Sequence, residues 1–210
     1  VNGGDLEGDL DVSRRGMGTA IVLSAGGQRG GEIGGSVRVA GGIGTLMAHG
    51  GDISGEVEAG GAVQLVMAID GDVSGNVTAG QNLEALQAIN GSISAGSVEA
   101  GGRMGTVMAI GGDVDADLTA NGGPIGNVMA IRQWNPASGT LAGGSIEGNI
   151  QASGGIDSIL ASGGNLTGIV DSGSRGLSSV TVTSSYDWKQ ARQVGGVFSG
   201  DINSGGPLHN

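Results

Sequence analysis

The chain has 210 residues, of which 48 are glycine, only 2% are aromatic and none is cysteine. The lack of cysteine excludes disulfides and thiolate metal sites, and the scarcity of aromatic residues excludes a globular core of large side chains. A net charge of −11 and a pI near 4.3 argue against nucleic-acid binding, because the phosphate backbone would be repelled. We see no signal peptide or membrane-spanning run and expect no membrane insertion, and the lack of an initiator methionine indicates a mature or excised chain.

The chain opens with a glycine-punctuated unit, GGDLEGDL at 3–10, and is interrupted near Arg14–Arg15 and again near Gln28–Arg29. From 31 to 90 it consists of three lines of equal length, GEIGGSVRVAGGIGTLMAHG, GDISGEVEAGGAVQLVMAID and GDVSGNVTAGQNLEALQAIN. Ile33, Ile53 and Val73 share one column of this alignment. A repeat of about twenty residues is typical of a solenoid, in which each repeat packs only on its neighbours.

Apolar and polar residues alternate within each line. Ile53, Gly55, Val57 and Ala59 alternate with polar residues, which predicts a strand with one buried face and one wet face. A second apolar run follows at 63–69. No run reaches helix length without a glycine, which costs roughly 1 kcal/mol relative to alanine inside a helix. Each line is therefore predicted to be one coil of a parallel β-solenoid.

Tight corners are predicted between the coils. The residue before each leading glycine is always Gly, Asn or Asp, the types that tolerate a left-handed backbone. These corner residues are Gly30, Gly50, Asp70, Asn90, Gly111, Gly143, Gly163 and Gly195.

The aliphatic columns are expected to point inward and form the core. One set of inward ladders comprises Ile53, Val57, Val73, Val77, Val98 and Val114. Another is expected to comprise Met47, Met67, Met108 and Met129.

Later coils start at 91, 112, 144 and 164, and a partial coil starts at 196. The coil that opens at 112 leaves the pattern after 131, and a longer interruption covers 184–192. The sequence thus predicts one all-β domain, 1–210, of about nine coils of roughly 20 residues, with loop insertions in coils 1, 6 and 8.

The interruptions carry aromatic and basic residues that are rare elsewhere in the chain. Trp, Tyr and Arg dominate binding hot spots, so these loops are candidate lateral or partner-binding sites. The alternative is that each loop folds back and covers its own coil. The candidate residues are Arg132, Trp134, Tyr186, Trp188 and Arg192.

The last residues of the chain resemble an internal segment. GGPLHN at 205–210, followed by Val1, matches GGPIGNV at 122–128, so tail and head written together complete a coil and open the next. The end of a solenoid also exposes unpaired strand groups and an apolar cross-section, and no cap is visible in the sequence. We therefore expect the ends of successive copies to meet, through Val1, Leu6, Leu10, Phe198, Ile202, Pro207 and Leu208.

Acidic residues recur at the second position of the repeat, in the column Asp5, Glu32, Asp52, Asp72 and Asp113. Neighbouring coils lie about 4.8 Å apart, where two exposed carboxylates repel by roughly 1 kcal/mol. A cation such as calcium would relieve this repulsion, although the calcium-binding nonapeptide GGxGxDxUx does not occur. The alternative is a solvated acidic face, softened by salt and by Ser92, Ser145 and Asn165 in the same column. We assign no metal site.

No catalytic constellation is visible. His49 and His209 lie in different coils, no GxxxxGK[ST] phosphate-binding motif occurs, and the carboxylates are spread along one face. We therefore expect neither an enzyme nor a cofactor. Three strings fit the N-glycosylation pattern, at Asn76, Asn90 and Asn165.

The coil units GDISGEVEAGG and GSIEGNIQASGG, with their aliphatic ladders, resemble the β-solenoid regions of bacterial surface proteins such as filamentous haemagglutinin-like adhesins. The chain is also similar to bactofilins, although their coils are shorter and more uniform. The resemblance implies a right-handed parallel β-helix that serves as scaffold, fibre or adhesin.

Two functions follow as expectations. The first is a structural subunit of an extracellular filament, in which copies of the chain stack head to tail. The second is a cell-surface adhesin, whose solenoid presents its aromatic and basic loops to a glycan or receptor. Both place the chain outside the cell or on its surface.

Overall fold

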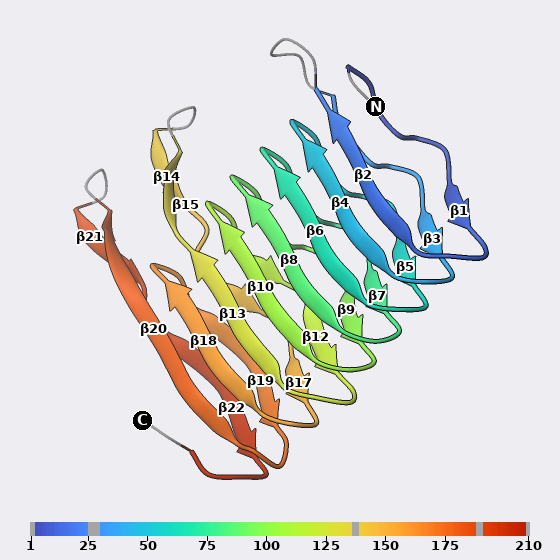
Figure 1. The fold of residues 1–210 in the computed structure, drawn as a ribbon. Helices are drawn as coiled ribbons and strands as arrows, with labels where there is room; N and C mark the ends of the chain where they lie inside the picture. The colour runs from blue at the N-terminus through green and yellow to red at the C-terminus, as the bar shows by residue number, and fades with distance from the viewer. Residues whose placement is uncertain (1–2, 25–29, 136–138, 188–190, 209–210) are drawn as a thin grey trace.

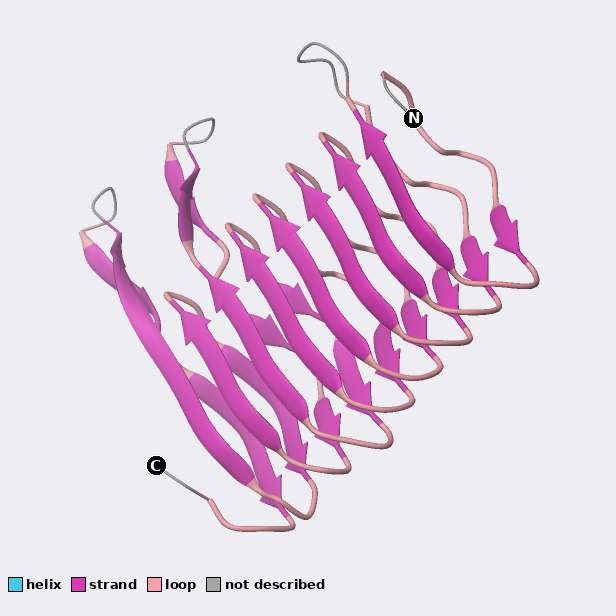
Figure 2. Cartoon of the chain, viewed as in Figure 1, coloured by secondary structure: helices cyan, strands magenta, loops and turns pink. Residues whose placement is uncertain are grey.

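The computed structural model describes residues 3–24, 30–135, 139–187 and 191–208. These residues form strands and turns without any helix, and nearly all of the strands pair in parallel with strands one repeat away (Figures 1 and 2). The expected all-β solenoid class is therefore confirmed.

The longer strands form one sheet, seen in front in Figure 1. Their order follows the chain, and every pairing is parallel except that of β21 with β20. The strands are β2 (Met17–Leu23), β4 (Ile43–His49), β6 (Val63–Ile69), β8 (Leu83–Ile89), β10 (Met104–Ile110), β13 (Ile125–Ile131), β18 (Ile156–Ser162), β20 (Leu177–Asp187) and β21 (Arg192–Gly195). We call this the long-strand sheet.

A second sheet lies behind it, and because most of its strands, all but β19 and β22, have two to four residues we call it the short-strand sheet. Its main ladder is parallel and contains β1 (Leu10–Val12), β3 (Val37–Val39), β5 (Val57–Ala59), β7 (Val77–Ala79), β9 (Ser97–Ala100), β12 (Asp117–Ala120), β17 (Ile150–Ala152), β19 (Leu166–Ser172) and β22 (Phe198–Ser204). β11 (Val114–Asp115) and β16 (Ile146–Glu147) pair with each other, and β16 also pairs with β19. Single parallel bridges extend their ladder back from Val114 to Leu6, through Ile93, Val73, Ile53 and Ile33.

The core lies between the two sheets and consists of stacked aliphatic side chains. Val57 pairs with Val37 and Val77 in register, and all three are fully buried. The expected inward ladder is confirmed, because its six members are each 0% exposed: Ile53, Val57, Val73, Val77, Val98 and Val114.

The expectation that the methionines point inward is wrong. Val66 and Ala68 are fully buried, whereas Met67 between them is only partly buried. Side chains alternate between the two faces of a strand, so Met67 and its neighbours Met47, Met108 and Met129 lie on the outer face. The run 63–69 is apolar on both faces, so hydrophobicity alone does not identify the inward one.

The corners take the backbone conformation that their residue types predict. Asp70 and Asn90 have φ of 58° and 57°, and the glycines at the same corner, Gly50, Gly111 and Gly163, have φ between 78° and 85°. The left-handed region is costly for most residues and cheap for Gly, Asn and Asp, which explains this column of the repeat.

Two connections at the carboxyl ends of long strands are extended into antiparallel pairs (Figure 2). After β13, β14 (Gln133–Asn135) pairs with β15 (Thr140–Ala142). β20 itself continues past the sheet, and its far end pairs with β21. We call these the β14–β15 hairpin and the β20–β21 hairpin, and both project from the same edge of the long-strand sheet. Arg14 and Arg15 lie in the turn between β1 and β2, and Gln28–Arg29 lies outside the described residues.

Candidate functional sites: the corner column, the coil ends and the hairpins

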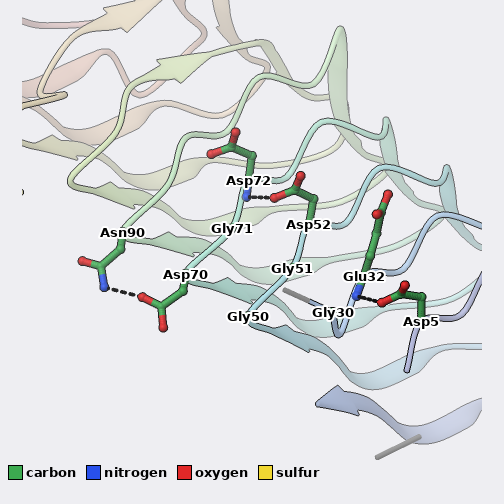
Figure 3. A pocket seen from close by; sticks show the side chains of 10 residues that line it. All are labelled: Asp5, Gly30, Glu32, Gly50, Gly51, Asp52, Asp70, Gly71, Asp72 and Asn90. Carbon is green, nitrogen blue, oxygen red and sulfur yellow. Dashed lines mark hydrogen bonds between the residues drawn. The ribbon is translucent and has the colours of Figure 1, made fainter. Parts of the chain in front are cut away.

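The acidic column forms a ladder of hydrogen bonds between coils. The backbone N–H of Asp72 donates to Oδ1 of Asp52 at 2.8 Å, and that of Ser92 donates to Oδ1 of Asp72 at 2.7 Å (Figure 3). Asp5 accepts in the same way from the N–H groups of Gly31 and Glu32, at 2.8 and 3.0 Å. Each of these aspartates thus satisfies an amide at a corner of the next coil, whereas Oε1 of Glu32 accepts from Oγ of Ser54.

Serine and asparagine continue the same ladder. The N–H of Asp113 donates to Oγ of Ser92 at 3.1 Å, and the N–H of Ser145 donates to Oδ1 of Asp113 at 2.7 Å. Oγ of Ser145 then accepts from Asn165, and Oδ1 of Asn165 accepts from Val197. The neutral oxygens of Ser92, Ser145 and Asn165 accept the same hydrogen bond between coils. The column therefore requires a hydrogen-bond acceptor at this position and not a negative charge.

A hollow of about 510 Å³ runs along the corners of this column. It is polar, and Figure 3 shows its side chains following one another from coil to coil. Asn90 lies at one end, where its Nδ2 donates to Oδ1 of Asp70 at 2.7 Å. No cluster of three or more potential metal-ligating side chains occurs among the described residues. The hydrogen bonds to the next coil give a structural reason for the aspartates of this column.

At the amino-terminal end, β1 has a single neighbour, β3, among the described strands. Leu6 and Leu10 of this end are only partly buried, and they pack against the core together with Val12 and Met17. Gly3 donates its N–H to the carbonyl of Leu23 at 2.8 Å, so it lies in register with the corners that close each long strand. Val1 lies outside the described residues.

The carboxyl-terminal end is more exposed. β22 has one neighbour in the described part of the chain, β19, and its Phe198 and Ile202 are 41% and 36% exposed. Leu208 is 63% exposed and bridges Leu177, which continues the ladder of Ile125 and Ile156. Leu208 therefore occupies the first position of a long strand, where the match between 205–210 and 122–128 places it. Pro207 is also exposed, and its carbonyl accepts from the N–H of Leu177.

The hairpins carry most of the aromatic residues. Trp134 on β14 is 55% exposed, and Tyr186 on β20 is 41% exposed. Arg192 on β21 is also exposed, and Trp188 lies outside the described residues.

Arg132 connects the two hairpins to the solenoid. Its Nη1 donates to the carbonyl of Gly163 at 2.8 Å and to Oγ of Ser185 at 3.1 Å, and its Nη2 donates to the carbonyl of Leu141 at 3.4 Å. Leu141 belongs to β15 and Ser185 to β20, so one guanidinium contacts both insertions. Its position indicates a brace for the hairpins.

The three glycosylation strings lie at corners or turns. Asn76 is exposed, and its Oδ1 accepts from the N–H of Ser97 at 3.0 Å. Asn90 is exposed and bonded to Asp70, and the partly buried Asn165 belongs to the corner ladder. Asn76 is therefore the one of the three that is exposed and whose side-chain nitrogen is not bonded to a corner residue in the described part of the chain.

Sequence reasoning missed the outer face of the long-strand sheet. An inward placement of the methionines leaves this face without its most apolar residues, so the sequence pattern does not indicate it as a surface. The signal was a column of alanines one residue after the methionine column. All of these alanines are fully buried: Ala48, Ala68, Ala88, Ala109 and Ala130. Small residues recurring at one position indicate the tightly packed inner face. Because successive side chains of a strand point to opposite faces, the neighbouring methionines then lie on the outer face.

Stacked parallel strands that return to the same ladder once per repeat define this molecule as a parallel β-helix. The described part of the chain contains no helix that is long and apolar enough to cross a membrane. Comparison with protein-family models, curated proteins and solved structures found no match to this chain.

Proposed function

We propose that the chain is a right-handed solenoid of about nine coils that serves as a structural subunit of an extracellular filament. Copies of the chain stack head to tail, so that the coil axis runs along the fibre. The proposal rests on the apolar strand edges at both ends, because an open edge next to apolar side chains is a template for association.

The two ends of the chain occupy complementary parts of one coil. Gly3 stands at the corner that closes a long strand, and Leu208 stands at the start of one. The tail of one copy and the head of the next would together occupy one long-strand position. Leu208 occupies the coil position of Val63, and Leu6 occupies that of Val73. The stretch from Leu208 across the chain ends to Leu6 of the next copy has two residues fewer than the stretch from Val63 to Val73 in a regular coil. Separate chains accommodate that difference as a break in the strand.

Energetically, the stacked ends gain both hydrogen bonds and apolar burial. Phe198, Ile202 and Leu208 would lose their exposed area against Leu6 and Leu10 of the next copy. Apolar burial contributes about 25 cal/mol per Å² of area removed from water. A heterologous contact that does not close into a ring extends indefinitely, which gives a filament.

Truncation tests this proposal. Full-length protein should sediment as a broad distribution of large species, and the protein that ends at Ser204 should sediment as small species of defined mass. Circular dichroism should show the same β content for both. A truncated protein that still forms large species would refute end-to-end stacking.

The exposed aromatic residues of the hairpins support a second candidate, a cell-surface adhesin. Trp134 and Tyr186 present aromatic surface on insertions that project from one edge of the sheet. Glycans and receptors commonly bind such residues through stacking and apolar contact. Binding to a glycan array that disappears in a Trp134→Ala, Tyr186→Ala variant would favour this function, and unchanged binding would exclude a role for the hairpins.

A further inference from the structure

The two sheets of the solenoid differ in the chemistry of their outer faces. On the short-strand sheet, the outward column between the buried residues of each strand includes Arg38, Glu58 and Glu99, all exposed to solvent. On β4, β6, β8, β10, β13 and β18 of the long-strand sheet, charged residues occur only in the column next to the start of the strands, at Glu84 and Asp157, and the outward positions beyond that column are uncharged. The chain contains 9 Lys and Arg and 20 Asp and Glu residues, so their absence from the rest of this face requires an explanation.

Three columns make up this uncharged face on β4, β6, β8, β10, β13 and β18, and we call it the Met–Ile face. The central column consists of Met47, Met67, Gln87, Met108, Met129 and Leu160. The column after it consists of His49, Ile69, Ile89, Ile110, Ile131 and Ser162. The column before it consists of Thr45, Leu65, Ala85, Thr106, Asn127 and Ser158.

None of these residues is Asp, Glu, Lys or Arg, and His49 is the one titratable side chain among them. Charged residues mark one margin instead, where Glu84 near the start of β8 pairs with Arg103 and Asp157 is exposed in the same column on β18. The methionines and isoleucines are partly buried because each is covered at its sides by its neighbours in the adjacent coils, which leaves the outer tips in water. A centre without charge, rich in Met and bordered on one side by charged residues, has the composition of an interface core.

The area of the Met–Ile face is close to what a specific contact requires. Six strands about 4.8 Å apart, covered over about five residues of roughly 3.3 Å each, give about 450 Å² per copy. Two such faces together remove roughly 900 Å² or more from water once the side chains interdigitate, close to the ~1,000 Å² at which specific interfaces begin.

We propose that the Met–Ile face binds the same face of a second copy of this chain, so that two solenoids pack sheet against sheet. Flat sheets pack face to face about 10 Å apart, and the side-chain rows of a second copy repeat at the same spacing of about 4.8 Å. The carboxylates of the corner column stay in water in this arrangement. A two-fold axis makes the contact isologous, so it closes after two copies.

This pairing is independent of end-to-end stacking, and a variant with charged ends separates the two. Ile202→Lys with Leu208→Lys places charges on exposed residues of the terminal coil and should stop stacking without unfolding the coils. In this background we expect sedimentation equilibrium to give twice the 20.2 kDa chain mass. Adding Met67→Lys and Met108→Lys should halve the mass. Adding Thr78→Lys, the matched outward change on the short-strand sheet, should leave the dimer intact.

A second experiment does not depend on the fold of the lysine variants. The chain has no cysteine, so Met67→Cys introduces a single thiol at the centre of the Met–Ile face. A bismaleimide that spans about 10 Å should convert this variant into a covalent dimer, whereas Thr78→Cys should stay monomeric.

Three outcomes would overturn the proposal. The first is a mass of 20.2 kDa for the end-charged protein, and the second is a dimer that survives the two methionine substitutions. The third is a monomer that binds phosphatidylcholine vesicles through this face, which would assign the face to a lipid surface.

Discussion

Single residues stabilise this molecule in two ways, by filling ladders inside the coil and by accepting hydrogen bonds from the next coil. Val57 illustrates the first and Asp72 the second. Both act between neighbouring coils, so the effect of a substitution should be felt mainly within one or two repeats.

Val57→Asp should destabilise the coils around β5. The side chain is 0% exposed and packs between Val37 and Val77, so a carboxylate there has no partner that could compensate its burial. We expect the free energy of unfolding in urea to fall by at least about 3 kcal/mol. Glu58→Gln, an outward change on the same strand, should cost less than about 0.5 kcal/mol. Equal stability of Val57→Asp and the wild type would contradict the register.

Asp72→Ala and Asp72→Asn should separate the hydrogen bond of the corner column from its charge. Alanine leaves the N–H of Ser92 without its acceptor, which should cost about 1 kcal/mol in thermal or urea unfolding. Asparagine keeps an acceptor and removes one of the carboxylates stacked about 4.8 Å apart, so it should be neutral or stabilising at low salt. A loss of stability in Asp72→Asn equal to that in Asp72→Ala would show that the charge is required.

At the scale of the elements, the sequence predicts the strands better than it predicts their faces. The ladders around Ile53 and Val57 follow from alternation with polar residues, which marks the wet face unambiguously. The run 63–69 lacks that alternation. Which of its residues point outward is determined by packing against the short-strand sheet, which the sequence pattern does not show. The corner ladder was equally hidden, because sequence shows the aspartates but not the amides that face them.

The hairpins are the elements that depart most from the repeat. Arg132 supplies three hydrogen bonds from one side chain, to the carbonyl of Gly163 in the coil and to Leu141 and Ser185 of the two hairpins. Its Nε is buried without a hydrogen-bond partner among the described residues, so part of that gain is offset.

Arg132→Ala should therefore loosen both hairpins. Hydrogen exchange of the β14–β15 and β20–β21 amides should accelerate about 5-fold or more, the equivalent of about 1 kcal/mol, while β6 and β8 exchange as before. Arg103→Ala removes an arginine that is half exposed and paired with Glu84, and it should change exchange little. Unchanged exchange at both hairpins in Arg132→Ala would show that other contacts hold them.

At the scale of the whole molecule, the solenoid has four distinct surfaces with separate consequences. The two ends present apolar strand edges, the short-strand sheet presents charge, and the Met–Ile face presents no Asp, Glu, Lys or Arg. End-to-end stacking and face-to-face pairing use different surfaces, so a fibre of paired solenoids is compatible with both. The acidic corners would line the outside of such a fibre and keep fibres apart in solution.

Electron microscopy of the purified protein tests end-to-end stacking most directly. If copies continue one solenoid, each adds about nine coils of roughly 4.8 Å, so filaments should show an axial repeat of roughly 43 Å. The cross-β spacing of about 4.8 Å should run along the same axis. Filaments with strands aligned along the fibre, or isolated particles at every protein concentration, would contradict the account.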